Sequence, residues 1–272
     1  MSDDMTRIDL SFPIRSAGPQ VKSRRLAPPP LTLDCALFLD IDGTLLEIAA
    51  TPDSVEVDAA IATQLQTLAR VLGGAVALVT GRAIRDADKL FAGPRLPIAG
   101  QHGCERRSAD GSLHEHAPQP VGIEPLRAAL GELAARHQGL MLEDKGATLA
   151  LHYRLAPRLS AHVHRTVRAH VLQAVAAGGA WSLQRGKGLV EVRPEGIDKG
   201  TAIVDYMGEP PFRGRTPVFI GDDVTDELGF AAIEQLGGWA VKVGPGRTRA
   251  SYRLADVSAV RVWLAGISQE SR

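Results

Sequence analysis

Acidic side chains occur in two tight groups in this 272-residue sequence. The first group is Asp40-Ile41-Asp42, and the second comprises Asp222-Asp223 and Asp226. A single aspartate at such a place could be a helix N-cap. Carboxylates that converge repel one another unless a cation compensates their charge. Clustered oxygen ligands suit a hard ion such as Mg²⁺, which commonly takes one or two carboxylates, water and a phosphate oxygen. If the fold brings the two groups together, they predict a magnesium site.

Three short apolar segments precede polar residues and indicate how the fold would bring these groups together. The segments are Cys35–Leu39 before Asp40, Ala75–Val79 before Thr80, and Pro217–Ile220 before Gly221 and Asp222. Apolar segments without alternation are typical of strands that are buried on both faces of a parallel sheet. Ligands of such sheets bind beyond the carboxyl ends of the strands. We therefore expect Asp40, Thr80 and Asp222 at one edge of a parallel sheet, with helices over about residues 61–72, 84–91 and 225–236.

Residues 119–193 have a different pattern. Leucines at helical spacing predict one helix around residues 126–133, and a second helix is expected over about 158–176. Residues 148–154 and 189–193 alternate between apolar and polar side chains, which predicts an antiparallel sheet with one covered face and one free polar face. The sequence thus predicts an α/β fold with a Rossmann-like parallel-sheet core, residues 31–118 and 194–272. An α+β cap, residues 119–193, is inserted in it, and residues 1–30 form a flexible tail.

Composition restricts the classes of partner. Hydrophobic residues make up 44% and charged residues 23% of the chain, and the formal net charge is zero, so nothing points to nucleic acid. Two cysteines argue against a disulfide framework or a thiolate zinc site and suit a reducing compartment. No apolar stretch approaches the ~18 residues that a membrane span requires. We expect a cytoplasmic monomer that acts on a small molecule. His114 and His116, with His102, could form a second metal site, but an exposed hairpin explains this spacing better.

The segment Asp40-Ile41-Asp42-Gly43-Thr44-Leu45 resembles the first motif of the haloacid dehalogenase-like phosphohydrolases. Thr80 in Val79-Thr80-Gly81-Arg82 matches their second motif, Lys199 their third, and Gly221-Asp222-Asp223 their fourth. The resemblance implies that Asp40 attacks phosphorus to form an aspartyl-phosphate. It implies that Asp42 is first the general acid and then the general base.

The remaining motif residues receive roles in the same way. Thr80 and Lys199 would hold the phosphoryl oxygens, and the backbone N–H groups of Gly43-Thr44 would face the phosphate. Mg²⁺ would be bound by Asp40, the Asp42 carbonyl and Asp222, while Asp223 and Asp226 would act through water or orient these ligands. By itself, a lysine in Asp198-Lys199-Gly200 would be expected on the surface.

A narrower resemblance, to trehalose-6-phosphate phosphatases, covers nearly all of residues 35–265. It rests on Gly221-Asp222-Asp223-Val224-Thr225-Asp226-Glu227, on Glu143-Asp144-Lys145-Gly146 with residues 150–154, and on residues 186–194 leading into 196–200. It implies that the cap contacts the sugar through Glu143, Lys145, Arg154, Lys187 and Glu191. Arg82, Gln101, His102 and Gly103 would line the cleft between cap and core.

The residues alone leave one alternative open. Lys187 and Glu191 are four positions apart, so on a strand they share a face and could bind a polyhydroxyl ligand that carries a phosphate. They could equally form a salt bridge across strands.

The implied activity is hydrolysis of trehalose 6-phosphate with Mg²⁺. The rivals are a related phosphatase, such as one for sucrose phosphate, and a non-catalytic domain that binds a sugar phosphate. The pair Asp40 and Asp42 favours an enzyme, because a binding module has no need of the second acid.

Overall fold

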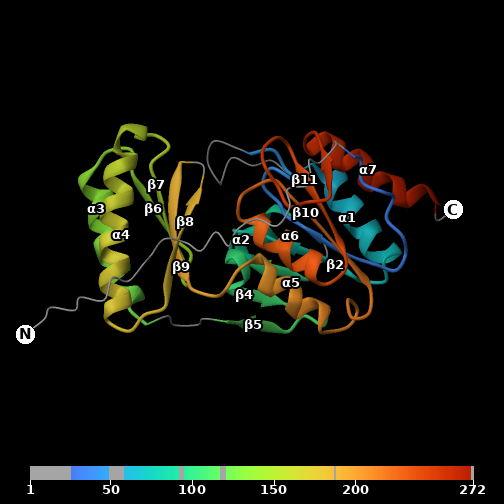
Figure 1. The fold of residues 1–272 in the computed structure, drawn as a ribbon, viewed down its shortest axis with the longest axis horizontal. Coiled ribbons are helices and arrows are strands. Elements are labelled where there is room, and N and C mark those ends of the chain that lie inside the picture. Colours follow the sequence, from blue (N-terminus) through green and yellow to red (C-terminus); the bar gives the residue numbers. More distant parts are fainter. Residues whose placement is uncertain (1–25, 49–57, 92–94, 117–120, 187, 271–272) are drawn as a thin grey trace, which may run out of the picture.

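The computed structural model describes residues 26–48, 58–91, 95–116, 121–186 and 188–270, which contain one eight-stranded and one four-stranded sheet (Figure 1). The eight strands are, in spatial order, β12 (Tyr252–Leu254), β11 (Trp239–Val243), β10 (Thr216–Gly221), β1 (Cys35–Leu39), β2 (Val76–Val79), β3 (Ile98–Gly100), β4 (Glu105–Arg107) and β5 (Leu113–Glu115). Neighbours from β12 to β3 are parallel, and β3–β4–β5 are antiparallel. The three apolar segments are the adjacent central strands β10, β1 and β2, as predicted.

Helices cover both faces of this sheet (Figure 1). One face carries α1 (Ala59–Val71), α2 (Ile84–Leu90) and α7 (Val257–Glu270), and the other carries α5 (Lys199–Met207) and α6 (Asp226–Gln235). The side chains of β1 alternate between the two layers: Leu37 and Leu39 pack with α1, whereas Phe38 packs with α5. This arrangement is the Rossmann-like core that the sequence predicts.

The smaller sheet is antiparallel and has helices on one face only (Figure 1). Its strand order is β6 (Met141–Asp144), β7 (Leu149–His152), β9 (Leu189–Pro194) and β8 (Trp181–Gly186), covered by α3 (Ile123–Arg136) and α4 (Ser160–Ala176). Leu149, Leu151 and Val190 point into this layer, as the alternation predicts. We call this sheet with its two helices the cap, and the remainder of the structure the core. The predicted boundaries of the domains stay predictions.

The opposite face of the cap sheet is not free at its centre, and here the prediction was wrong. Thr148 is fully buried and Glu191 is only 3% exposed. Both contact a core loop, Gln101–Gly103, which lies against this face. Alternation identifies the polar face of a strand, but it does not reveal which other segment covers that face.

Residues 26–30, the end of the predicted flexible tail, are also held by the core. The Arg253 N–H donates to the Leu26 carbonyl at 3.1 Å, and Trp263 Nε1 donates to the Pro29 carbonyl at 3.1 Å. Leu26 and Pro29 are therefore attached to the core, and residues 1–25 lie outside the described part. Among the described helices, none has the length and apolar character needed to cross a membrane.

Candidate active site

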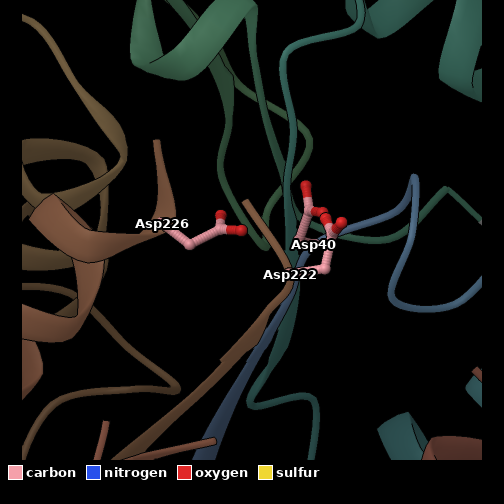
Figure 2. Close-up of side chains that lie close together, drawn as sticks. All are labelled: Asp40, Asp222 and Asp226. Carbon is pink, nitrogen blue, oxygen red and sulfur yellow. The ribbon is translucent and has the colours of Figure 1, made fainter. Parts of the chain in front are cut away.

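Asp40, Thr80 and Asp222 follow β1, β2 and β10 directly, so they lie at the carboxyl edge of the core sheet. Asp40, Asp222 and Asp226 each offer a carboxylate oxygen within 4.8 Å of the others (Figure 2). The two acidic groups of the sequence thus meet in space. This convergence is what the resemblance implies for a magnesium site.

Two glycines make room for these carboxylates. Gly43 has φ +83°, and a Cβ atom there would overlap the Asp222 carboxylate. A Cβ atom at Gly221 would overlap the carboxylate of Asp226. Glycine is therefore required for close packing at both positions, and in addition at Gly43 for its left-handed backbone. The Gly43 and Thr44 N–H groups donate to Leu46 and Ile41 carbonyls, so they do not face a phosphate as we predicted.

Lys199 is buried beneath the acidic cluster, although its local sequence suggests a surface residue. It is the first residue of α5, after the N-cap Asp198, and is 2% exposed. Its Nζ lies 2.7 Å from Asp40 Oδ1 and 2.6 Å from Asp226 Oδ1. Burial alone would lower the pKa of Lys199, but the carboxylates of Asp226 and Asp40 more than offset burial and raise it. The lysine is therefore a permanent cation at this site.

One ammonium does not balance these carboxylates. Burial raises the pKa of Asp40 well above its usual range; Lys199 opposes the rise, and Asp226 and Asp222 add to it. A cation between Asp40 and Asp222 would reverse this effect and keep both carboxylates ionised. Hard oxygen donors at this spacing fit Mg²⁺, so the residues present suit the predicted ion.

Asp42, the predicted general acid and base, is held by Arg82. The guanidinium donates from Nε to Oδ2 and from Nη2 to Oδ1 of Asp42, both at 2.6 Å. The Asp42 side chain is 36% exposed, so it can reach solvent or a ligand. Arg82 is therefore placed to orient Asp42, and it also borders the space in which a substrate would lie.

A cleft of about 630 Å³ lies between the cap and the acidic cluster. The predicted residues that line it are Asp40, Asp42, Thr80, Arg82, His102, Glu143, Lys145, Arg154, Glu191, Lys199, Asp222 and Asp223. Gln101 and Gly103 do not line the cleft: Gln101 is 4% exposed and bonded to Glu105 and Thr148, and Gly103 packs on the Asp198 carbonyl. Their positions do not support contact with a sugar. Lys187 lies outside the described residues.

Glu191 forms close polar contacts with both the cap and the core. Its Oε1 lies 3.0 Å from Lys145 Nζ in the cap, and its Oε2 lies 2.9 Å from His102 Nε2 in the core. Burial would raise the pKa of Glu191, but Lys145 and His102 hold it well below its usual range. Glu191 thus forms a salt bridge with Lys145, and its carboxylate still borders the cleft. The alternative of a salt bridge between Glu191 and Lys187 stays a prediction, because Lys187 lies outside the described residues.

The sequence analysis did not identify two cleft residues on β8, or a buried lysine near the acidic cluster. Gln184 and Arg185 lie on β8, and their strand could have been found because Trp181 and Leu183 alternate with polar residues. Lys242 is 5% exposed, and its ammonium donates to the carbonyls of Asp222 and Val243. A lysine inside the apolar segment Trp239–Val243 was the signal for this buried cation.

The three histidines His102, His114 and His116 do not come together as a second metal site in the described part of the chain. His114 lies on the exposed strand β5 of the β4–β5 hairpin, as we expected, and contacts Ser108 at 3.1 Å. His116 lies 3.2 Å from Asp205, whereas His102 is buried against Glu191.

Comparison with known proteins agrees with this geometry. The model of the family described as trehalose-phosphatase matches residues 38–258. A probable trehalose-phosphate phosphatase of Sinorhizobium fredii is 46% identical over 210 residues, which are 77% of this chain and 78% of the relative. The trehalose-6-phosphate phosphatase of Escherichia coli is 44% identical over 244 residues, 88% and 89% of the two chains. The C-terminal domain of a trehalose-6-phosphate phosphatase from C. albicans has the same fold, with a TM-score of 0.76 at 20% identity over 86% of this chain and 92% of that one. The chain therefore belongs to the trehalose-phosphatase family.

Proposed function

We propose that this protein is a Mg²⁺-dependent phosphatase that hydrolyses trehalose 6-phosphate to trehalose and phosphate through an aspartyl-phosphate on Asp40. The observation that carries the proposal is the position of Asp40. Its carboxylate is buried at the end of β1, contacts the Lys199 ammonium at 2.7 Å, and faces a cleft that the cap encloses. A fixed carboxylate that Mg²⁺ would keep ionised is what a covalent phosphoryl transfer requires.

The first step joins Asp40 to the phosphoryl group. A carboxylate oxygen of Asp40 forms a bond to phosphorus while the bond between phosphorus and the sugar oxygen breaks. The leaving oxygen takes its proton from Asp42, which lies two residues further along the same edge. Arg82 donates to both carboxylate oxygens of Asp42 in this conformation, so the hydrogen bond to the oxygen that carries the proton must open when Asp42 acts as the acid.

The second step releases phosphate. Asp42, now a carboxylate, takes a proton from water, and the water oxygen attacks phosphorus while the bond to Asp40 breaks. Lys199 and the hydroxyl of Thr80 hold the phosphoryl oxygens, where negative charge must be stabilised during both transfers. Asp40, the Asp42 carbonyl and Asp222 would hold Mg²⁺, which supplies positive charge when one anion attacks another.

The cap supplies selectivity in this proposal. Glu143 and Arg154 line the cleft from the cap, and they offer an acceptor and a donor for sugar hydroxyls. A disaccharide phosphate would place its phosphate at the acidic cluster and its hydroxyls against these side chains. The substrate is then a small soluble sugar phosphate. A monomeric, cytoplasmic protein stays our expectation.

The test is phosphate release from a panel of sugar phosphates that includes trehalose 6-phosphate, sucrose 6-phosphate and glucose 6-phosphate, with Mg²⁺. We expect the highest kcat/KM for trehalose 6-phosphate. A higher value for sucrose 6-phosphate would replace the substrate but keep the chemistry. Binding of trehalose 6-phosphate without any release of phosphate would instead identify a regulatory domain.

A further inference from the structure

The carbonyl groups of the turn Thr80-Gly81-Arg82 are all occupied. The Thr80 carbonyl accepts from the His102 N–H at 2.9 Å, and the Arg82 carbonyl accepts from the Gln101 N–H at 2.8 Å. The Gly81 carbonyl accepts from Lys145 Nζ at 3.0 Å, and this donor belongs to the cap. The turn that carries the predicted phosphate ligand Thr80 is therefore held by one core loop and by one cap side chain.

The core loop that holds this turn has a strained backbone. Gln101 and His102 have φ values of +48° and +59°, in the left-handed region that residues with a Cβ atom rarely adopt. Such conformations persist only where the surroundings fix them, and they concentrate at functional sites. The Gln101 side chain is fixed by Glu105 in the core at 3.1 Å and by Thr148 in the cap at 3.2 Å. The cap thus supplies part of what stabilises the loop.

The imidazole of His102 connects the cap to the turn. Its Nε2 lies 2.9 Å from the buried Glu191 carboxylate of β9. Its Nδ1 has no hydrogen-bond partner among the described residues, so the proton that the ring donates is on Nε2. A Cβ atom at Gly81 would come within 2.7 Å of this same Nε2, which means that the ring lies directly on Gly81. One side chain therefore contacts both the cap sheet and the centre of the turn.

We propose that His102 is a positioning residue that couples closure of the cap to the geometry of the turn Thr80-Gly81-Arg82. Glu191 holds the imidazole on Gly81, and Lys145 donates to the Gly81 carbonyl. Withdrawal of the cap would remove both contacts and leave the strained loop to relax, which would move the turn. This inference rests on the proposed function, because it takes Thr80 as a ligand of the transferred phosphoryl group. It adds a role for Glu191 and Lys145 that does not depend on any sugar.

The test compares ligands with and without a sugar. His102→Ala, Glu191→Ala and the double variant are assayed with trehalose 6-phosphate and with a small aryl phosphate. Binding of orthovanadate, a phosphoryl analogue, is measured by calorimetry in the presence of Mg²⁺. We expect each single variant to lose about tenfold or more in kcat/KM for the aryl phosphate, because small displacements of positioning groups have effects of this size. Orthovanadate binding should weaken in parallel.

Two further variants make the test specific. The double variant should be no worse than the poorer single variant by more than about twofold, because coupled residues do not act additively. His102→Gln keeps an N–H donor toward Glu191 and should restore most of the activity. Glu132→Ala removes an exposed cap carboxylate that pairs with Arg136 on α3, so it should change neither substrate nor orthovanadate binding.

The coupling would be overturned if His102→Ala and Glu191→Ala lost activity on trehalose 6-phosphate alone, since both residues would then be sugar contacts. It would also be overturned if the variants melted at lower temperature but kept wild-type kcat/KM and orthovanadate affinity. If the wild type hydrolyses the aryl phosphate and not trehalose 6-phosphate, the proposed substrate fails, and the aryl phosphate and orthovanadate comparisons still decide the coupling. If it hydrolyses neither, orthovanadate affinity decides it alone.

Discussion

The core and the cap each bury one charge that is shared between two partners, and the two arrangements differ in their net charge. In the core, the Lys199 ammonium lies between the carboxylates of Asp40 and Asp226, with Asp222 nearby. In the cap, the Glu191 carboxylate lies between the Lys145 ammonium and the imidazole of the core residue His102. The core cluster therefore has excess negative charge, whereas the cap cluster is balanced.

This difference explains which region can take up a ligand. A buried cluster with excess charge is costly until a counter-ion binds. The core cluster is thus prepared for a cation and for the phosphoryl group that the cation attracts. The cap cluster needs no further charge, and its residues Glu191 and Lys145 contact the core through His102 and the Gly81 carbonyl. Glu143 and Arg154 line the cleft. We expect changes in the core to affect every substrate and changes at the cap surface to affect only sugar phosphates.

The largest effect is expected from Asp40→Asn. An amide cannot form the phosphoenzyme, so turnover of both the aryl phosphate and trehalose 6-phosphate should fall by about 10⁴-fold or more. The matched control is Asp58→Asn, the same change at the exposed N-cap of α1, where Asp58 accepts from the Ala60 N–H. Phosphate release is measured for both. Near wild-type release from Asp40→Asn would rule out the covalent step.

The second-largest loss of turnover is expected from removal of Mg²⁺. A metal ion contributes several kcal/mol of charge stabilisation in phosphoryl transfer, so excess chelator should lower turnover of both substrates by about 10³-fold. Added Mg²⁺ should restore activity, and Ca²⁺ should do so poorly because it prefers more ligands at longer distances. Full activity in excess chelator would mean that the carboxylates of Asp40 and Asp222 have a purpose other than metal binding.

Asp42→Asn should lower the turnover of the two substrates unequally, although Asp42 lies in the core. Loss of a general acid typically costs about 10²- to 10⁴-fold, and the loss should be greatest for trehalose 6-phosphate, because a sugar alkoxide leaves less readily than a phenolate. Initial rates of both substrates give the ratio. An equal loss for both substrates would argue that Asp42 does not protonate the leaving group. Any difference in kcat/KM between the two substrates would then come from the cap alone.

Glu143→Ala should have a moderate and selective effect. A missing hydrogen bond to a ligand is worth ~1–3 kcal/mol, or about ten- to a hundredfold in kcat/KM for trehalose 6-phosphate. Hydrolysis of the aryl phosphate should not change. The matched control is Glu132→Ala, which removes an exposed carboxylate that pairs with Arg136 on α3, away from the cleft. Equal losses on the two substrates would contradict the division of labour between core and cap.

The smallest effect on turnover is expected from Leu130→Ala, inside the cap and fully buried. The free energy of unfolding of this variant should be about 2–5 kcal/mol lower than that of the wild type, because replacing a buried leucine with alanine leaves a cavity. Below the melting temperature, aryl phosphate hydrolysis should be nearly normal. Leu37→Ala, the same change in the fully buried β1, should destabilise the protein similarly and also lower turnover, because β1 carries Asp40. Unfolding by denaturant and initial rates test this contrast.

The sequence predicts the centre of the molecule better than its periphery. The strands β1, β2 and β10 are unbroken apolar segments that end in polar residues, and this pattern is distinctive. The strands β3 and β12 have only three residues each, too few for any periodicity. For this reason their positions could not be predicted.

The charged residues show the same limit. The local sequence of Lys199 suggests a solvated side chain, and only its partners Asp40 and Asp226, distant in the chain, explain its burial. Alternation assigns Glu191 to the polar face of its strand, but the loop that carries His102 and covers this face is a tertiary contact. Local patterns therefore identify which side chains are polar and leave open which of them are paired.

The most direct test of the account is to trap the phosphoenzyme from two substrates. The Asp42→Asn variant lacks the base for the second step, so with Mg²⁺ it should accumulate the intermediate quickly from the aryl phosphate, whose phenolate leaves without a proton. Trehalose 6-phosphate should give the same intermediate more slowly, because its leaving oxygen lacks the acid. After an acid quench, peptide mass spectrometry should find one phosphoryl group on Asp40 with both substrates. A phosphoryl group on another residue, or wild-type turnover without any labelled Asp40, would contradict the claim that the core performs the same chemistry on every substrate.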